Sequence, residues 1–352
     1  MSNSEFDYLI VGQGLAGSVL SYLLMRQGKK VLVIDSFDAN SSSQVAAGLV
    51  NPITGRRIVK SWMADTLIPF AETFYSAVEN EFGKLFYHKM DVLEVIRTVK
   101  ELNEWSGRME EEEMRKYFIK NVPENNYKEN ISAFLKMIRI TSSAWMNIPV
   151  FIEFCKMKLN ESFALIDESF DHSKLKIEID FIEYKNIISK KIIFCEGYKS
   201  FLNPLWKWLP FLPAKGEILL IECKNLPEGF ILLSGIFLIP VGNHKFRVGS
   251  TYEWNFSHEK PTEEGKSKIL IQLNNLLKIP FRVIEHHAGI RPTVKDRRPL
   301  IGNHPEHKNV FIFNGMGTKG VQLVPYFAHQ FVEYLINKKN LSADVDIKRF
   351  IN

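Results

Sequence analysis

The apolar positions near the N-terminus predict a strand, a helix and a second strand in close succession. Residues Asp7 to Val11 are mostly apolar and end in the β-branched pair Ile10 and Val11, which is typical of a short buried strand. Apolar positions then recur at helical spacing from Leu15 to Gln27, and Gly28 supplies a helix stop. Lys30 to Ile34 is a second buried strand. The pattern therefore predicts a βαβ unit that closes within about 30 residues.

The turn between the first strand and the helix carries the run Gly12-Gln13-Gly14-Leu15-Ala16-Gly17. Gly12 permits the tight turn, Gly14 lets the backbone approach a pyrophosphate, and Gly17 lets helix and strand pack closely. The helix N-terminus offers unpaired N–H groups and a positive dipole end to phosphates. Asp35 can accept hydrogen bonds from ribose hydroxyls, and an acid there disfavours a 2′-phosphate. The run predicts a dinucleotide site that suits FAD and NAD equally, and the alternative is a glycine-rich turn without a ligand.

Further strand and helix patterns follow along the chain. Strand-like runs span 85–96, 163–168, 175–181, 190–195, 216–222, 230–240 and 245–251, and helical patterns span 65–81, 262–277 and 321–336. The run 190–195 ends in Glu196-Gly197-Tyr198, which indicates another parallel strand that delivers a glycine turn to the edge of the first sheet. The first three runs suggest an inserted antiparallel sheet, to which the last three also belong. Mixed charged helices and loops fill 99–130, and we see no internal repeat.

The C-terminal third of the chain carries several further motifs. They are Gly289-Ile290-Arg291-Pro292-Thr293, Asp296, Pro299-Leu300-Ile301-Gly302, Asn309 to Phe313, and Gly315-Met316-Gly317-Thr318-Lys319-Gly320. With the N-terminal run, Lys215-Gly216-Glu217 and Val248-Gly249-Ser250-Thr251, the chain resembles the FAD-dependent D-amino acid oxidase superfamily, which includes glycine oxidase and sarcosine oxidase. The similarity covers nearly the whole chain, strongly at both ends and loosely over 99–130. The compact turn 315–320 also resembles the FAD-dependent domain of bacterial tRNA wobble-uridine modification enzymes.

The resemblance implies FAD as the cofactor and an α/β fold class. We expect a Rossmann-like FAD-binding domain with a parallel sheet, discontinuous in sequence, and an inserted antiparallel-sheet substrate domain. The expected boundaries are 1–80, 140–215 and 285–352 for the FAD-binding domain, and 81–139 and 216–284 for the substrate domain. The expected cofactor-binding residues are Gly12, Gly14, Leu15, Ala16, Gly17, Asp35, Ser36, Ala47, Gly48, Gly197, Gly315, Gly317, Thr318, Lys319 and Gly320.

Two residues are candidates for a direct part in the reaction. Arg291 matches the position where amino-acid oxidases of the superfamily place an arginine that holds the substrate carboxylate in a bidentate pair. The alternative for Arg291 is a structural ion pair with Asp296. Lys319 could add positive charge where the turn 315–320 faces the flavin N1 and C2 carbonyl, and the alternative is an ordinary solvated lysine. Tyr198 and Tyr252 are weaker candidates for the substrate pocket.

Two departures from the family pattern limit the chemistry. Sarcosine-oxidase-like members attach flavin through a cysteine where this chain has Ile290 and Arg291, so we expect noncovalent FAD. Glycine oxidase has a longer turn with an arginine where this chain has only Met316 to Lys319, which argues against glycine as the substrate. His286 and His287 would face opposite ways on a strand, so we assign no metal site.

The expected function is oxidation of the C–N bond of a small amine or amino-acid-like substrate, by hydride transfer to flavin N5 and without a dedicated base. The electron acceptor is left open. The alternatives are an FAD-dependent dehydrogenase, an oxidoreductase that modifies a tRNA-borne amine, and a noncatalytic dinucleotide-binding protein.

Composition and charge indicate which partners and which cellular compartment to expect. The net charge of +5 is scattered along the 352 residues, which is weak evidence for a nucleic-acid partner and does not exclude one. Cys155, Cys195 and Cys223 are unclustered, which favours neither disulfides nor zinc and fits a reducing cytoplasm. The uncharged segment from Tyr8 to Met25 is interrupted by the glycine run, so we expect no membrane span and no signal peptide.

Overall fold

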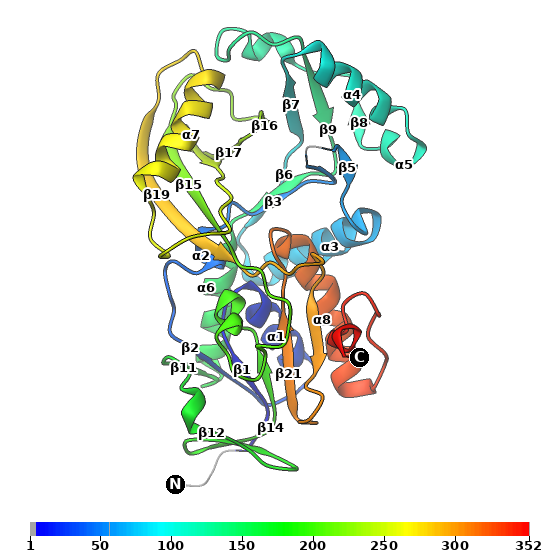
Figure 1. Cartoon of the computed structure of the whole chain (residues 1–352), viewed down its shortest axis with the longest axis vertical. Coiled ribbons are helices and arrows are strands. Elements are labelled where there is room, and N and C mark those ends of the chain that lie inside the picture. The colour runs from blue at the N-terminus through cyan, green and yellow to red at the C-terminus, as the bar shows by residue number, and fades with distance from the viewer. Residues whose placement is uncertain (1–4, 56, 352) are drawn as a thin grey trace. The chain divides into compact units, whose positions relative to one another are not determined.

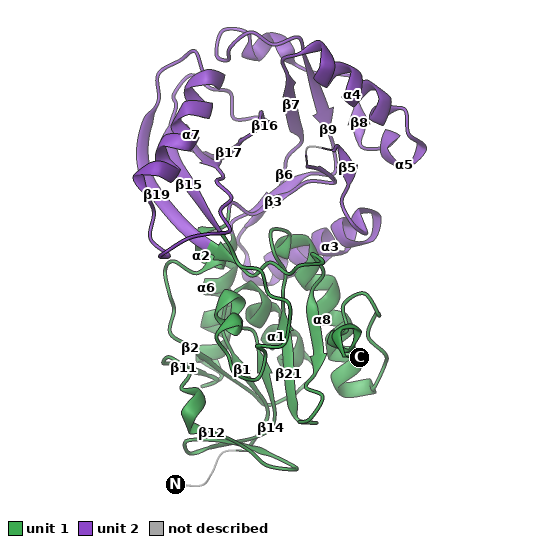
Figure 2. Ribbon diagram, viewed as in Figure 1, with its two compact units in different colours: residues 1–46, 148–214, 290–352 green, residues 47–147, 215–289 purple. Residues whose placement is uncertain are grey.

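The computed structural model describes residues 5–55 and 57–351. The chain forms two compact units, each assembled from separate parts of the sequence (Figure 1, Figure 2). Unit 1 comprises 1–46, 148–214 and 290–352, and unit 2 comprises 47–147 and 215–289. Each unit has its own large sheet and its own hydrophobic core.

Unit 1 is built on a sheet whose central strands are parallel. The strands β11 (Leu165–Asp167), β2 (Val31–Asp35), β1 (Glu5–Val11), β14 (Ile187–Phe194) and β21 (Val310–Asn314) lie side by side in that order. Strand β13 (Ile182–Tyr184) pairs antiparallel with β14, and β12 (Leu175–Ile177) pairs antiparallel with β13. Strand β20 (Leu300–Asn303) pairs antiparallel with β21. The helices of this unit are α1 (Leu15–Arg26), α2 (Ser42–Val45), α6 (Ile148–Glu161) and α8 (Gly320–Asn337). Helix α1 packs against α6 and α8.

The βαβ unit predicted from the sequence is confirmed, because β1, α1 and β2 occupy the expected residues and β1 pairs in parallel with β2. The parallel strand predicted at 190–195 is also confirmed as β14. The strands predicted at 163–168 and 175–181 were placed in the wrong sheet. Helix α6 carries the chain across so that β11 joins β2 in parallel, and β12 forms a hairpin with β13 beside β14.

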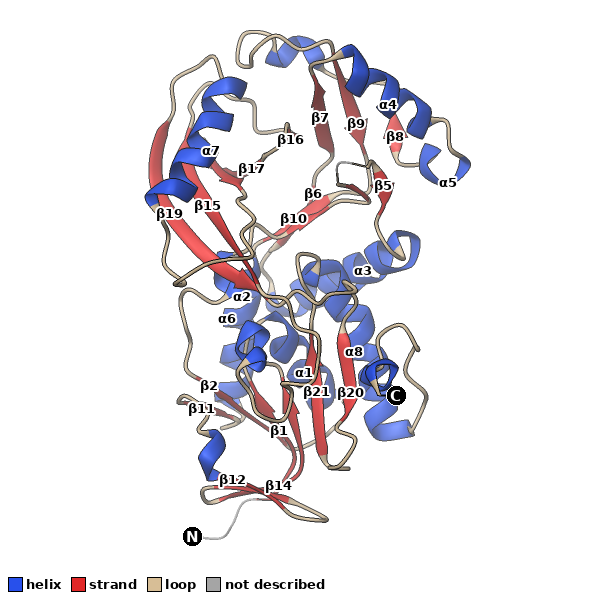
Figure 3. Cartoon of the chain, in the orientation of Figure 1, coloured by secondary structure: helices blue, strands red, loops and turns tan. Residues whose placement is uncertain are grey.

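Unit 2 is built on a second sheet of eight strands, shown in red in Figure 3. Their order is β19 (Arg282–Arg291), β15 (Ala214–Glu222), β18 (Lys245–Gly249), β17 (Phe237–Gly242), β16 (Ile231–Leu233), β7 (Val92–Ile96), β9 (Lys136–Ile140) and β8 (Phe118–Ile119). Neighbours from β15 to β16 and from β7 to β8 are antiparallel, whereas β16 and β7 are parallel. The helices of this unit are α3 (Ala64–Phe82), α4 (Val99–Met109), α5 (Glu112–Arg115) and α7 (Glu263–Leu276).

The unit boundaries differ from the expected domain boundaries at residues 47–80, 140–147, 215 and 285–289, which lie in unit 2. The cause is a small sheet in which β10 (Ala144–Met146) pairs with both β3 (Leu49–Val50) and β6 (Tyr87–Lys89). A short hairpin of β4 (Ile53–Thr54) and β5 (Val59–Lys60) follows β3. These pairings tie the segment after residue 46 to unit 2. Among the described residues, no helix combines the length and apolar character that a membrane crossing requires.

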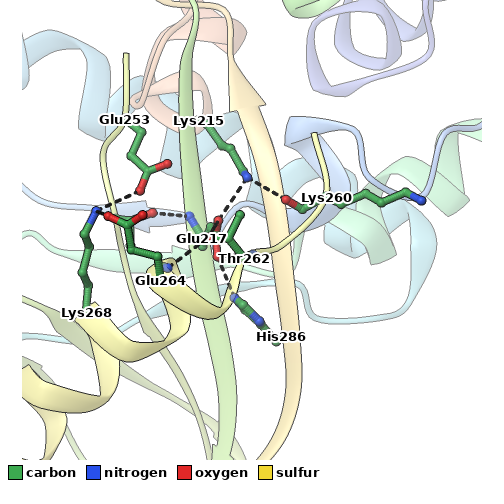
Figure 4. Close-up of polar contacts among 10 residues, drawn as sticks. Lys215, Glu217, Glu253, Lys260, Thr262, Glu264, Lys268 and His286 are labelled. Atoms are coloured by element: carbon green, nitrogen blue, oxygen red, sulfur yellow. Dashed lines mark hydrogen bonds and ion pairs between the residues drawn. The ribbon is translucent and has the colours of Figure 1, made fainter. Parts of the chain in front are cut away.

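A charged cluster is buried where α7 begins (Figure 4). Lys215 and Glu217 on β15 are 1% and 0% exposed, and their Nζ and Oε1 atoms lie 3.1 Å apart. Lys215 also donates to the Lys260 carbonyl at 2.6 Å. Thr262 caps α7 and donates to the Glu217 carboxylate from its N–H at 3.1 Å and its hydroxyl at 2.9 Å. His286 Nε2 on β19 lies 2.8 Å from the same carboxylate, so the cluster joins two strands to the helix.

Hydrogen bonding keeps the Glu217 carboxylate ionised inside the unit. Burial by itself raises the pKa of Glu217, but the bonds from Thr262, Lys215 and His286 outweigh it and hold the pKa below its ordinary value. The close packing leaves no room for a side chain at position 265 of α7, because a Cβ on Gly265 would lie 2.2 Å from Glu217 Oε2. Glu217 therefore fixes both the charge balance and the packing at the start of α7.

Lys215→Met should lower the free energy of unfolding by about 3–5 kcal/mol, because it leaves a buried carboxylate without its lysine. For Glu217, the lowered pKa means that its contribution is full above the pKa of the unfolded carboxyl and is lost as pH falls through the folded-state pKa. Denaturant unfolding should therefore show a constant difference in stability between the wild type and Glu217→Gln from pH 7 down to about 4.3, the pKa of an unfolded glutamate, and convergence of the two proteins at lower pH. Lys268→Met removes only exposed ion pairs to Glu253 and Glu264 and serves as the control. An equal effect of Lys215→Met and Lys268→Met would contradict this account.

Candidate functional site

The candidate site lies at one edge of the unit 1 sheet. Strands β2, β1, β14 and β21 are parallel, so their carboxyl ends meet at the same edge. The loops that leave this edge contain four of the five predicted cofactor segments, namely Asp35 with Ser36, the run Gly12 to Gly17, Gly197, and the turn Gly315 to Gly320. The fifth segment, Ala47 and Gly48, belongs to unit 2.

The first glycine turn is held tightly against its neighbours. Gly12 has φ +102° and donates its N–H to the Ile34 carbonyl at 2.9 Å. A Cβ on Gly12 would lie 2.5 Å from the Cys195 carbonyl oxygen. A Cβ on Gly17 would lie only 1.9 Å from the Gly12 carbonyl oxygen. Both positions therefore require glycine for packing, and Gly17 performs the helix–strand role expected from its place in the run.

Gly14 differs from Gly12 and Gly17, because there is space around it. It is the N-cap of α1 with φ −72°, and no side chain caps the helix from this position. A Cβ there would meet only the Ser43 side chain, whose hydroxyl oxygen would lie 3.0 Å away. Ser43 already accepts a hydrogen bond from the Leu15 N–H at 3.0 Å. Backbone N–H groups at this helix start and a small hydroxyl fit the oxygens of a pyrophosphate.

Asp35 links the first glycine turn to the segment that follows β2. Its carboxylate accepts hydrogen bonds from the Gln13 N–H and the Phe37 N–H, each at 2.5 Å. A carboxylate has about four lone-pair positions, so both oxygens can still accept ribose hydroxyls. Gln13 is itself buried and donates from Nε2 to the Ile152 carbonyl at 3.0 Å, which anchors the turn to α6. The backbone N–H groups at the start of α1 and the Asp35 carboxylate together fit the adenosine half of a dinucleotide.

Asn314 joins the other two loops of the edge. Its Nδ2 donates to the Gly197 carbonyl at 2.8 Å and to the Ser200 hydroxyl at 2.7 Å. Its Oδ1 accepts from the Gly315 N–H at 2.8 Å. Neither Asn314 nor Ser43 was among the residues predicted from the sequence. The available signals were an asparagine between a buried strand and a glycine, and the polar run 40–44 after Asp35.

Lys319 is not an ordinary solvated lysine. It is half-buried, and its backbone forms the N-cap of α8, at the end of the helix that carries positive dipole charge. Burial lowers the pKa of Lys319 to about 8, with added repulsion from Arg297 and Arg298. This end of unit 1 therefore favours negative charge on whatever binds beside it.

Arg291 ends strand β19 and is half-buried. Asp296, the alternative ion-pair partner for Arg291, accepts from Arg349 Nε at 2.9 Å and from the Arg298 N–H at 3.0 Å. Of the weaker candidates, Tyr198 lies in a short 3-10 helix (Gly197–Phe201) of unit 1. Tyr252 is 46% exposed in unit 2.

The histidines offer little to a metal. His286 contacts the buried Glu217, while His287 contacts Glu285 at 2.8 Å, as expected for neighbours on opposite faces of a strand. Among the described residues, His304, Glu306 and His307 bring possible ligand atoms within 4.8 Å of one another. However, His304 Nδ1 accepts from the Glu306 N–H at 3.2 Å, and the ring also bonds to the Leu205 carbonyl. Both ring nitrogens of His304 are thus engaged within the fold.

Comparison with known proteins gives concordant results. Residues 170–334 match the model of the DAO family, described as FAD dependent oxidoreductase. The chain is 22% identical over 365 residues to glycine oxidase of Bacillus subtilis (strain 168), covering 95% of this chain and 94% of the relative. It is 24% identical over 357 residues to the tRNA 5-methylaminomethyl-2-thiouridine biosynthesis bifunctional protein of Hahella chejuensis, covering 91% of this chain and 55% of that protein.

The fold is also found among solved structures. Glycine oxidase from Bacillus cereus ATCC 14579 superimposes with a TM-score of 0.80 at 17% sequence identity, covering 95% of this chain and 96% of that chain. The α/β fold class expected from the sequence is thereby confirmed.

Proposed function

Since residues 170–334 match the model of the FAD dependent oxidoreductase family, we propose that the chain binds FAD noncovalently and oxidises the C–N bond of an amine or amino-acid-like substrate. The observation that carries the proposal is the convergence of two glycine turns, two helix N-termini and Asp35 on one edge of the unit 1 sheet. This set matches the pyrophosphate, the ribose and the electron-rich end of a flavin.

Each part of the site has a separate task in holding FAD. The first turn of α1, with Gly14 and Ser43, receives the pyrophosphate, and Asp35 receives the adenosine ribose. The start of α8 and Lys319 supply positive charge to the flavin pyrimidine ring. Cys155, Cys195 and Cys223 are all buried, and burial raises the pKa of Cys195, which supports noncovalent attachment.

FAD, when bound, supplies the redox chemistry by accepting a hydride at N5 from the carbon beside the amine. The chain's own contribution is orientation and charge. Arg291 holds the substrate carboxylate through its planar pair of N–H donors, which fixes the angle of the reacting C–H bond. Lys319 favours negative charge at the cofactor end of the site, and the substrate amine loses its proton to solvent without a dedicated protein base.

The charge on Lys319 gives a pH signature. Its lowered pKa of about 8 means that the ammonium is charged below that pH and neutral above it. The rate of flavin reduction by substrate, measured from pH 6 to 10, should therefore show a fall-off near pH 8 superimposed on the rise from amine deprotonation. Lys319→Met should remove the fall-off and lower the rate below pH 8, whereas Lys319→Arg should keep the rate high above it. Identical profiles for the three proteins would remove Lys319 from the mechanism.

Product analysis tests the proposal and separates oxidase from dehydrogenase. FAD-loaded protein is given a panel of amino acids and secondary amines, and oxygen uptake, dye reduction, ammonia and carbonyl products are measured in parallel. Oxygen uptake with carbonyl formation identifies an oxidase, and dye reduction without oxygen uptake identifies a dehydrogenase. Flavin-loaded protein that oxidises no member by either acceptor would contradict the small-amine proposal.

A second candidate function is oxidation of an amine carried on tRNA, favoured by the similarity to the Hahella chejuensis protein across 91% of this chain. Small amines and an undermodified tRNA should be compared directly as reductants of the bound flavin. Reduction by tRNA alone would favour this candidate.

A further inference from the structure

The chain between β14 and β15 includes a run of tight turns, 197–213, with a buried and an exposed side. The whole run belongs to unit 1 (Figure 2). Along it, the N–H groups of residues 202, 203, 206 and 209 donate to carbonyls three positions earlier. Turns of this kind place every third residue on the same side. The buried side follows that period and consists of Ser200, Asn203, Trp206 and Leu209.

Polar contacts anchor the buried side of this segment. Asn203 donates from Nδ2 to Glu196 Oε2 at 2.8 Å, and its Oδ1 accepts from the Leu205 N–H at 3.0 Å. The Ser200 hydroxyl accepts from Asn314 Nδ2 at 2.7 Å, at the edge of the parallel sheet. The backbone of the segment is therefore fixed to unit 1, and the fold itself directs the remaining side chains outward.

Large apolar side chains occupy the exposed side. Trp208 donates from Nε1 to the Leu205 carbonyl at 3.0 Å within the segment, so its indole needs no polar partner outside. Exposed apolar side chains that gather on one element mark a contact with a partner or a membrane, because their removal from water is favourable. Four side chains make up this outer apolar surface, namely Phe201, Leu202, Trp208 and Leu212, which are 51%, 66%, 37% and 43% exposed.

A second loop of unit 1 lies against the same segment. The Leu212 N–H donates to the Thr293 carbonyl at 2.8 Å, and the Lys295 N–H donates to the Pro210 carbonyl at 3.1 Å. The side chains of Lys295 and Arg297 on this loop are exposed. The outer apolar surface therefore has two cations on the loop beside it.

The charge around the outer apolar surface is positive. Residues 197–215 contain no Asp or Glu, and Lys207 on the exposed side adds a further cation. Asp296, the acid of the second loop, pairs with Arg349 at 2.9 Å and leaves the other cations of that loop uncompensated. Apolar side chains with Lys and Arg beside them are typical of protein surfaces that bind anionic lipid.

We propose that the outer apolar surface and its cations attach the chain to an anionic lipid surface. The apolar side chains enter the interfacial layer, and Lys207, Lys295 and Arg297 face the lipid phosphates. An RNA is the less suitable partner, because Leu202 and Leu212 are aliphatic and do not stack on bases. The inference concerns peripheral attachment and is independent of the proposed function, so its tests need no turnover.

Vesicle sedimentation of the purified chain is the first test. The vesicles are phosphatidylcholine alone, or three parts phosphatidylcholine to one part phosphatidylglycerol. Wild type should bind the neutral vesicles at least about 10-fold more weakly than the anionic ones. On anionic vesicles, Leu202→Gln/Trp208→Gln should lose at least about 10-fold in affinity through lost apolar contact. Lys207→Gln/Lys295→Gln should lose about 10- to 30-fold through lost charge.

Matched controls change the same kinds of side chain elsewhere in unit 1. Phe163 and Ile179 are exposed apolar residues, and Lys174 and Lys176 are exposed cations. Phe163→Gln/Ile179→Gln and Lys174→Gln/Lys176→Gln should therefore bind anionic vesicles as wild type does. Losses in the controls equal to those in the test variants, or no binding of wild type to anionic vesicles, would overturn the inference.

Fluorescence quenching by vesicles with brominated acyl chains is the second test, because it requires contact of the indole with lipid. Trp208→Phe keeps an apolar ring, so it should bind like wild type and be quenched clearly less. Trp254→Phe replaces an exposed tryptophan of unit 2 and should be quenched like wild type. Equal quenching of wild type and Trp208→Phe would contradict the inference.

Two further measurements detect a different occupant of the outer apolar surface. If Leu202→Gln/Trp208→Gln does not fold, Leu202→Gln/Leu212→Gln carries every comparison. Self-association of wild type that this variant abolishes, without vesicle binding, would assign the surface to a second copy of the chain. Binding of tRNA that the variant abolishes, again without vesicle binding, would assign it to RNA. Either result would overturn attachment to lipid.

Discussion

Gly14→Val should abolish FAD retention and leave the fold intact. The backbone at Gly14 has φ −72°, which any residue can adopt, and the added Cβ would meet only the Ser43 side chain at 3.0 Å. The valine methyl groups would instead occupy the space in front of the α1 N-terminus, where we propose that the pyrophosphate binds. We expect the dissociation constant for FAD to rise at least about 100-fold, equivalent to about 2.7 kcal/mol. Flavin content after purification and fluorescence titration of the apoprotein measure this.

Gly229→Val is the matched control for this prediction. Gly229 has no heavy atom within 4 Å of its added Cβ and lies in unit 2, so the same substitution there should change neither flavin content nor melting temperature. Gly17→Val differs again, because its Cβ would lie 1.9 Å from the Gly12 carbonyl oxygen and should disrupt folding. Normal flavin content in Gly14→Val would place the pyrophosphate elsewhere.

Arg291→Ala should reduce kcat/KM for a carboxylate-bearing amine by about 30- to 5,000-fold, since losing a buried charge-assisted contact costs about 2–5 kcal/mol. Flavin content should be unchanged, because the proposed role of Arg291 is to hold the substrate and not FAD. Arg291→Lys should recover only part of the loss, because an ammonium lacks the planar fork of donors. Steady-state kinetics with a carboxylate-bearing amine and its decarboxylated analogue measures the effect.

The decarboxylated analogue supplies the internal control for Arg291. It lacks the group that Arg291 would bind, so wild type and Arg291→Ala should oxidise it at similar low efficiency. If Arg291→Ala lost efficiency equally on both amines, the residue would have a structural role instead.

Local patterns were sufficient to predict the part of the fold where we propose the nucleotide site. A buried strand, three spaced glycines, an amphipathic helix and an acid stand within residues 7–35, and each position is fixed by its immediate neighbours. The family resemblance, FAD dependence and an oxidoreductase function, inferred from motifs, are also confirmed by the family match and by the glycine oxidase and tRNA-modification relatives.

The pairing of strands that lie far apart in the chain was harder to predict from the sequence. The three residues of β11 read as a strand in any sheet, and only α6 decides that they join β2 in parallel. Residues 47–80 follow the βαβ unit directly, yet β3 pairs with β10 almost a hundred residues later and carries the segment into unit 2. The pattern of apolar positions within a segment does not indicate which distant strand that segment pairs with.

Side chains that act through distant partners were missed for the same reason. Asn314 bonds to Gly197 and Ser200, more than a hundred positions earlier in the chain. Arg247 in the sequence is one of many charged residues, and only the fold brings it to Trp145. The roles of Arg291 and Lys319 stay predictions.

The most direct test of the central claim is an anaerobic titration of the purified protein, followed by absorbance, with amines and amino acids added one at a time. The account predicts flavin bands that bleach with at least one member of the panel and that pass into the supernatant when the protein is precipitated with acid. A colourless protein that also fails to take up added FAD, or a bound flavin that no amine reduces, would contradict it.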